Sequence, residues 1–241
     1  AGSSLCAQGK QPVDANWHKA QELEKLGEFL KAAEIYEKSV QAEKDNPAPI
    51  KPNIVTGLNQ AAHYYSLAGQ YKTATEKIEE ALEIAEELER KDIVAECLNR
   101  FGFFYDYLKR YDVAIKYYLE ALEININSGY EDKVAANLNY IGNTYNSSGQ
   151  HDTAIEYLER ALDLGKKHNW EDKVATVLDN IGRVYETIGK YDNAIEYYDK
   201  ALSIDRKLEL EEKVSNGLSN VGNIYKSWEQ YTTAINYYEE S

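Results

Sequence analysis

The chain has 241 residues, and 43% of them are hydrophobic, which is enough for a buried core in one large or two ordinary domains. Its 41 Asp and Glu residues outnumber its 27 Lys and Arg residues, so the formal net charge is −14. This charge disfavours binding to nucleic-acid phosphates and docking on anionic lipid through a basic patch. No stretch approaches the roughly 18 consecutive apolar residues of a transmembrane helix, so we expect no nucleic-acid partner and no membrane insertion.

The first residues lack the pattern of a folded element, and segment 1–13 is predicted to be disordered or processed. Within it, Leu5-Cys6-Ala7-Gln8 resembles the tail of a signal peptide, with a small Ala at the cleavage position. The location is left unknown by so short a pattern, which is compatible with an exported or periplasmic protein. A cytoplasmic location stays open as the alternative, because the given residues include no apolar segment by which a signal peptide could be recognised.

A unit of about 40 residues then repeats along the chain. Its six copies begin with a weaker one and end with one that stops in mid-repeat: 25–40, 61–82, 101–122, 141–162, 181–202 and 221–241. Most copies carry a Gly after an amphipathic run, where a positive φ can end a helix. An Ala follows five residues later in every copy, and this small side chain lets two helices approach closely. Each unit is therefore predicted to be a pair of antiparallel helices.

The order aromatic, Gly, aromatic, Ala resembles the tetratricopeptide repeat over residues 14–241. The resemblance implies an all-α fold, a right-handed superhelical solenoid of about six antiparallel helix pairs. The unit is longer than the roughly 34 residues usual in the family. In this respect it is similar to Pins-type spindle-orientation adaptors, Rap-type peptide receptors and sensor proteins with helical-repeat domains.

Three of the four prolines fall between the first and second copies, where they would interrupt a helix. We therefore expect a first helix pair at 14–46, a Pro-rich break at 47–53 and an array of five repeats at 54–241, the last incomplete. An incomplete last repeat leaves an open array end, and two copies could form a homodimer through such ends.

No catalytic or cofactor-binding motif is recognisable. The four histidines occupy different repeats and columns and form no HExxH pair, and there is no Gly-rich phosphate loop and no GxSxG. Cys6 and Cys97 lack the spacing of metal ligands. The chain is predicted not to be an enzyme and to need no metal or cofactor.

Polar residues that differ between repeats recur in three columns of the first helix of each pair, at spacing i, i+4 and i+7. This spacing places them on one helix face. The resemblance implies that this face lines a concave groove. These columns differ between repeats while the core columns stay constant, which is expected of a surface that binds another chain. With their close neighbours, these columns supply the candidate partner-binding residues Asn59, His63, Asn99, Arg100, Phe103, Asn139, Asn143, Asn146, Asp179, Arg183, Glu186, Asn220 and Asn223.

An Asn amide has donors and acceptors for an extended peptide, although it could instead bond the adjacent repeat or water. Replacing Asn139 and Asn143 by Ala is therefore expected to weaken partner binding and to leave helicity and the melting temperature nearly unchanged. Arg100 and Arg183 are the only cations expected beside the groove, so a carboxylate clamp of the chaperone-tail type is not predicted. The negative charge favours a neutral or basic partner, although surplus acid could also serve solubility alone.

The leading hypothesis is a non-catalytic protein–protein interaction module that binds a peptide or helical segment in the concave groove. The alternative is a sensory or regulatory region of a larger signalling protein, a kinase or a transcription regulator, cut at residue 241 within a repeat.

Overall fold

The computed structural model describes the backbone of residues 12–241 and the side chains from His18 onward. Residues 1–11, with the signal-like Leu5-Cys6-Ala7-Gln8, lie outside the described part of the chain. The first helix begins at Pro12, two residues before the start predicted for the first helix pair. The described chain divides into two compact units, unit 1 up to Ser128 and unit 2 from Gly129 to Ser241.

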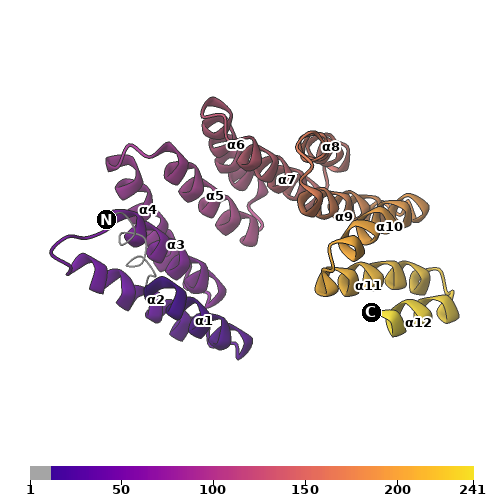
Figure 1. Ribbon diagram of the computed structural model, residues 1–241, viewed down its shortest axis with the longest axis horizontal. Coiled ribbons are helices and arrows are strands. Elements are labelled where there is room, and N and C mark those ends of the chain that lie inside the picture. The colour runs from indigo at the N-terminus through magenta and orange to yellow at the C-terminus, as the bar shows by residue number, and fades with distance from the viewer. Residues whose placement is uncertain (1–11) are drawn as a thin grey trace, which may run out of the picture. The chain divides into compact units, whose positions relative to one another are not determined.

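Residues 12–241 form twelve α-helices and no strand, in agreement with the all-α fold class predicted from the repeat (Figure 1). Unit 1 contains α1 (Pro12–Lys25), α2 (Phe29–Lys44), α3 (Lys51–Leu67), α4 (Tyr71–Glu87), α5 (Lys91–Tyr107) and α6 (Tyr111–Asn127). Unit 2 contains α7 (Glu131–Ser147), α8 (His151–Lys167), α9 (Glu171–Thr187), α10 (Tyr191–Lys207), α11 (Glu211–Ser227) and α12 (Tyr231–Glu240). The odd-numbered helices are the first helices of the pairs, and the even-numbered helices are the second.

A short turn ends each first helix, and its geometry explains the Gly column. In the second pair, the Gln70 N–H donates to the Tyr65 carbonyl at 2.9 Å and the Gly69 N–H donates to the Ser66 carbonyl at 3.1 Å. This Schellman arrangement satisfies carbonyls at the helix end and needs a positive φ at the residue after the cap. Positive φ angles occur at this junction in all six pairs, at Gly27, Gly69, Lys109, Gly149, Gly189 and Glu229.

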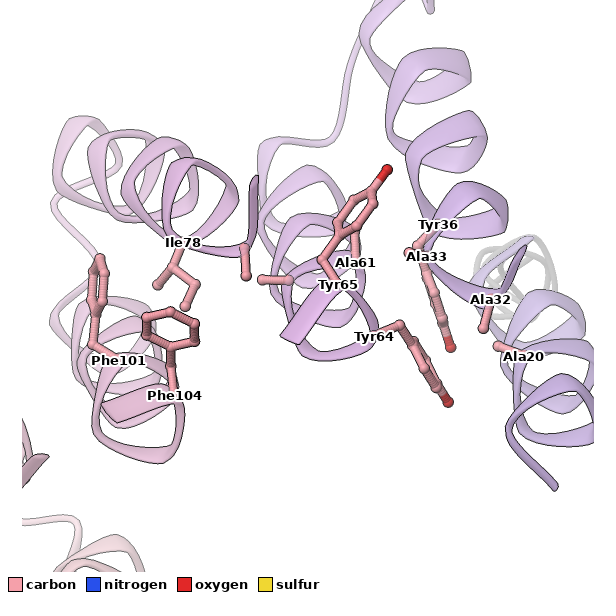
Figure 2. Close-up of a cluster of buried hydrophobic side chains, with 12 residues drawn as sticks. Ala20, Ala32, Ala33, Tyr36, Ala61, Tyr64, Tyr65, Ile78, Phe101 and Phe104 are labelled. Atoms are coloured by element: carbon pink, nitrogen blue, oxygen red, sulfur yellow. The ribbon is translucent and has the colours of Figure 1, made fainter. Parts of the chain in front are cut away.

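Small and aromatic side chains fill the space between the helices of each unit. Members of the Ala column are buried, with Ala74 and Ala154 at 0% exposure. A Tyr from each helix of a pair stacks beside them, with ring centroids 5.6 Å apart for Tyr105–Tyr117 and 5.4 Å for Tyr185–Tyr197. Figure 2 shows such a cluster in unit 1, whose labelled side chains are Ala20, Ala32, Ala33, Tyr36, Ala61, Tyr64, Tyr65, Ile78, Phe101 and Phe104.

The proline-rich segment is a short connection between helices. Helix α2 ends at Lys44 and α3 begins at Lys51, so Pro52 lies in the first turn of α3. Proline is tolerated there because the N–H it lacks has no partner within the helix. Helix α2 packs against α3 within unit 1, and the boundary between the two units falls after Ser128.

Candidate functional site

Three consecutive helices of unit 1 line a pocket that we call the apolar pocket. It lies between α3, α4 and α5 and has a volume of about 450 Å³. Its lining residues are Asn59, Ala62, His63, Ser66, Leu67, Ile78, Arg100, Phe103, Phe104, Asp106 and Tyr107. Most of these side chains are apolar or aromatic, as is usual for pockets that hold a small molecule or a single side chain.

The walls of the apolar pocket come from both helices of a pair and from the next first helix. Ile78 of α4 and Phe104 of α5 are buried and point toward one another (Figure 2). Phe103 and Tyr107 are 43% and 51% exposed, which is high for aromatic side chains. Tyr71 packs against Tyr107, with ring centroids 6.3 Å apart. The pocket therefore offers an aromatic surface that solvent can reach.

Two polar groups of the apolar pocket have unusual surroundings. Asn59 is 1% exposed, and its Nδ2 donates to Cys97 Sγ at 3.6 Å, whereas its Oδ1 has no hydrogen-bond donor among the described residues. The half-buried Arg100 forms no ion pair or hydrogen bond with any residue from 18 to 241. Desolvation and then the charge of Arg100 lower the pKa of His63, so this ring favours the neutral state.

The first helices of unit 2 form a second hollow, which we call the polar pocket. It has a volume of about 510 Å³ and reaches across α7, α9 and α11. Its lining residues are Asn143, Asn146, Ser147, Arg183, Glu186, Thr187, Tyr191 and Ser227. Amide, guanidinium, carboxylate and hydroxyl groups therefore replace the aromatic walls found in unit 1.

Most side chains of the polar pocket are positioned by a neighbour. Arg183 Nη2 donates to Asn180 Oδ1 at 2.6 Å, and the Tyr198 hydroxyl donates to Glu186 Oε2 at 2.6 Å. Burial and the bonded Glu186 raise the pKa of Tyr198, which keeps this hydroxyl protonated as the donor. The half-buried Asn143 makes no hydrogen bond within the described part of the chain. Its amide is therefore available to a ligand.

A ladder of hydrogen bonds connects consecutive first helices of unit 2. Asn180 Nδ2 donates to Asn139 Oδ1 at 2.7 Å, and Asn220 Nδ2 donates to Asp179 Oδ1 at 3.2 Å. Each rung joins residues that are 41 positions apart. Burial raises the pKa of Asp179 in spite of the nearby Arg183. These amides hold neighbouring repeats together, which was the alternative to ligand binding for this column.

The structure brings the predicted residues together in two groups and separates the others. Asn59, His63, Arg100 and Phe103 line the apolar pocket, whereas Asn143, Asn146, Arg183 and Glu186 line the polar pocket. Asn139, Asp179 and Asn220 belong to the ladder. Asn223 accepts a hydrogen bond from the Tyr238 hydroxyl at 2.7 Å, and Asn99 is half-buried on α5 outside the apolar pocket.

Sequence reasoning missed one column of lining residues at the end of each first helix. Its members are Leu67 and Tyr107 in the apolar pocket and Ser147, Thr187 and Ser227 in the polar pocket. They lie one residue beyond the last column that was singled out, at the same 40-residue spacing. Their change from apolar side chains to hydroxyls was the signal that could have identified them.

Three further observations concern chemistry and membranes. Among the described residues, no group of three or more His, Cys, Asp and Glu side chains is arranged to hold a metal ion. Burial raises the pKa of the Cys97 thiol to about 11, which makes it a poor nucleophile. No described helix combines the length and the apolar character needed to cross a bilayer.

Comparison with known proteins agrees with this architecture. The sequence profile of the tetratricopeptide repeat matches residues 13–46, 93–167 and 173–241. No curated protein matches the sequence significantly.

Several solved structures have a similar fold. BtubC (BKLC) from P. vanneervenii is 23% identical with a TM-score of 0.67, over 94% of this chain and 87% of that chain. Aspartyl phosphate phosphatase F from Bacillus subtilis is 18% identical with a TM-score of 0.69, over 93% and 68% of the two chains. The Rap conjugation gene regulator of the plasmid pLS20, in complex with the Phr* peptide, is 14% identical with a TM-score of 0.67, over 100% and 78%. At these identities the likeness shows a shared fold.

Proposed function

Because the chain belongs to the tetratricopeptide-repeat family, we propose that it is a non-catalytic interaction module that binds a peptide or helical segment of a partner protein. The contact surface is the face of the first helices of unit 2, and the polar pocket lies on this face. One observation carries the proposal: the unpaired amide of Asn143 lies in a pocket that spans three successive first helices.

The chemistry of the polar pocket suits an extended peptide. A peptide presents an N–H and a C=O at each residue, and the Asn143 amide can donate to one and accept from the other. Arg183 uses Nη2 to bond Asn180, so its other N–H groups can bind a peptide carbonyl. Because Arg183 and Glu186 balance one another and the whole chain carries −14, we expect the peptide to be neutral or basic.

Proteins of similar fold lend support by analogy. The Rap conjugation gene regulator of pLS20 was solved with the Phr* peptide, and another Rap protein was solved with the Competence and Sporulation Factor. These ligands belong to those proteins, and the identities are 14% and 18%. They support a peptide as the class of ligand to test on this chain.

The test begins with a phage-displayed peptide library selected on the whole chain. A synthetic peptide from the enriched set is then titrated by fluorescence anisotropy against the wild type and Asn143→Ala. We expect the substitution to weaken binding about fivefold to tenfold, because two peptide hydrogen bonds lose their partner. Helicity and the unfolding midpoint should stay the same, since Asn143 bonds no other described residue.

The matched control is Asn193→Ala, which removes an exposed amide from α10 outside the polar pocket. This variant should bind the peptide like the wild type. The proposal is wrong if no peptide is enriched, or if folded Asn143→Ala binds as tightly as the control.

A further inference from the structure

The apolar pocket of unit 1 contains a break in the ladder that connects first helices. In unit 2, each ladder acceptor receives a hydrogen bond from the residue 41 positions later in the chain, as Asn139 does from Asn180. The corresponding pair in unit 1 is Asn59 and Arg100, and no hydrogen bond joins them. The apolar pocket therefore contains two groups without a partner among residues 18–241. They are the buried acceptor Asn59 Oδ1, which has no donor there, and the Arg100 guanidinium, which has no anion there.

Each of these two groups lowers the stability of the folded protein while it has no partner. A buried polar atom without a partner loses the hydrogen bonds that water would give it. A half-buried guanidinium also loses hydration, and carboxylates are the side-chain-sized anions that match its fork of N–H donors. A ligand that brings a carboxylate to Arg100 and an N–H group to Asn59 Oδ1 would correct both defects.

The rest of the apolar pocket defines the body of such a ligand. Ile78, Phe103 and Phe104 form an apolar wall beside Arg100. Asp106 lines the pocket six residues further along α5, which corresponds to about 9 Å of helix rise. An anion is therefore favoured only at the Arg100 end, and the body of the ligand extends along the aromatic wall.

We propose that the apolar pocket binds a small carboxylic acid with an aryl or branched apolar body, whose carboxylate pairs with Arg100 while the body packs on Ile78, Phe103 and Phe104. A volume of about 450 Å³ falls within the range of roughly 300–1,000 Å³ found for small-molecule sites. This site lies in unit 1 and takes a different class of ligand from the polar pocket. It therefore goes beyond the peptide-binding function and does not depend on it.

The experiment titrates the whole chain by isothermal calorimetry with indole-3-acetate, 4-phenylbutyrate and the branched 4-methylpentanoate. The neutral indole-3-acetamide serves as an isostere that lacks the charge. We expect saturable binding of at least one acid, with indole-3-acetate binding about tenfold or more tightly than its amide. The indole N–H also supplies the donor that Asn59 Oδ1 lacks.

Two variants and a control separate the parts of the site. Arg100→Gln should weaken binding of the acid about tenfold or more and leave the amide unaffected. Phe103→Asn, which introduces the residue found at position 143, should weaken the acid and the amide alike. Arg110→Gln is the control, because its exposed guanidinium lies over the Tyr105 ring at 5.3 Å, outside the pocket.

Two results would overturn the proposal. One is that none of the three acids binds saturably at millimolar concentration to protein with native helicity. The other is that a selected peptide, and no free acid, binds in an Arg100-dependent way, which would make the apolar pocket part of a peptide surface. Because the peptide test uses Asn143 of unit 2, failure of either test leaves the other interpretable.

Discussion

The two pockets occupy equivalent positions in the repeat but offer opposite chemistry. Phe103 of unit 1 stands in the column that holds Asn143 and Arg183 in unit 2. Tyr107 stands in the column of Ser147 and Thr187. The Ala column, by contrast, is buried in both units. The frame is therefore shared, and the identity of a few groove residues decides whether a repeat presents an aromatic wall or a set of hydrogen-bonding groups.

The ladder between first helices differs in the same way. In unit 2 the donors and acceptors of the ladder pair with one another, and Asn180 also holds Arg183 in place. In unit 1 the donor position is occupied by Arg100, and Asn59 Oδ1 is left without a donor. We expect the complete ladder to contribute to stability, and we expect the incomplete one to leave the Arg100 charge and the Asn59 oxygen for a ligand. This contrast leads to two predictions, and a pair of equivalent turns leads to a third.

The largest effect is expected from breaking the ladder of unit 2. Asn180 is 6% exposed and hydrogen-bonds both Asn139 Oδ1 and Arg183 Nη2. Asn180→Ala removes both hydrogen bonds. We expect a loss of about 1–2 kcal/mol in the free energy of unfolding, because partly buried polar groups become unsatisfied. Urea denaturation followed by circular dichroism measures it, with Asn193→Ala as an exposed control. Equal midpoints for the two variants would mean that the ladder contributes nothing.

Much of this architecture could be predicted from the sequence, because local rules determine it. The Gly and Ala columns reflect the turn after each first helix and the close contact between paired helices. The columns at i, i+4 and i+7 include nine residues that line the two pockets, since one helix face is enough to place them.

The remaining features depend on contacts between helices, which periodicity does not specify. Asn139 and Asn143 are indistinguishable as residue types in neighbouring columns, yet the first bonds Asn180 and the second is unpaired. Ile78 reaches the apolar pocket from α4, a second helix, which no pattern along the first helices could indicate. Pro52 was expected in a break, although the first turn of a helix tolerates it.

A smaller effect of opposite sign is expected from completing the ladder of unit 1. Arg100→Asn places a short amide donor opposite Asn59 Oδ1, as in the Asn180–Asn139 rung. The new hydrogen bond and the removal of an unpaired charge should raise the free energy of unfolding by about 0.5–1.5 kcal/mol.

The same denaturation measurement tests this variant, and Arg110→Asn controls for the loss of one cation from unit 1. If Arg100→Asn lowered stability below that of the control, the guanidinium would have a structural role in unit 1, and the contrast between the two ladders would not hold.

The smallest effect concerns two equivalent turns, one from each unit. Lys109 holds a φ of +57° at the junction where the equivalent residue of unit 2, Gly149, has +82°. A side chain in this region costs about 1–2 kcal/mol, whereas Gly adds about 0.4–1 kcal/mol of entropy to the unfolded chain. Lys109→Gly should therefore stabilise the protein by about 0.5–1 kcal/mol. Gly149→Ala should destabilise it by a similar amount.

The midpoint of thermal unfolding, compared with that of the wild type, measures the effect of each variant. Because neither residue lines a pocket, binding of peptide and of acid should not change. Altered binding in Lys109→Gly would show that the turn, and not only the groove columns, determines the chemistry of unit 1.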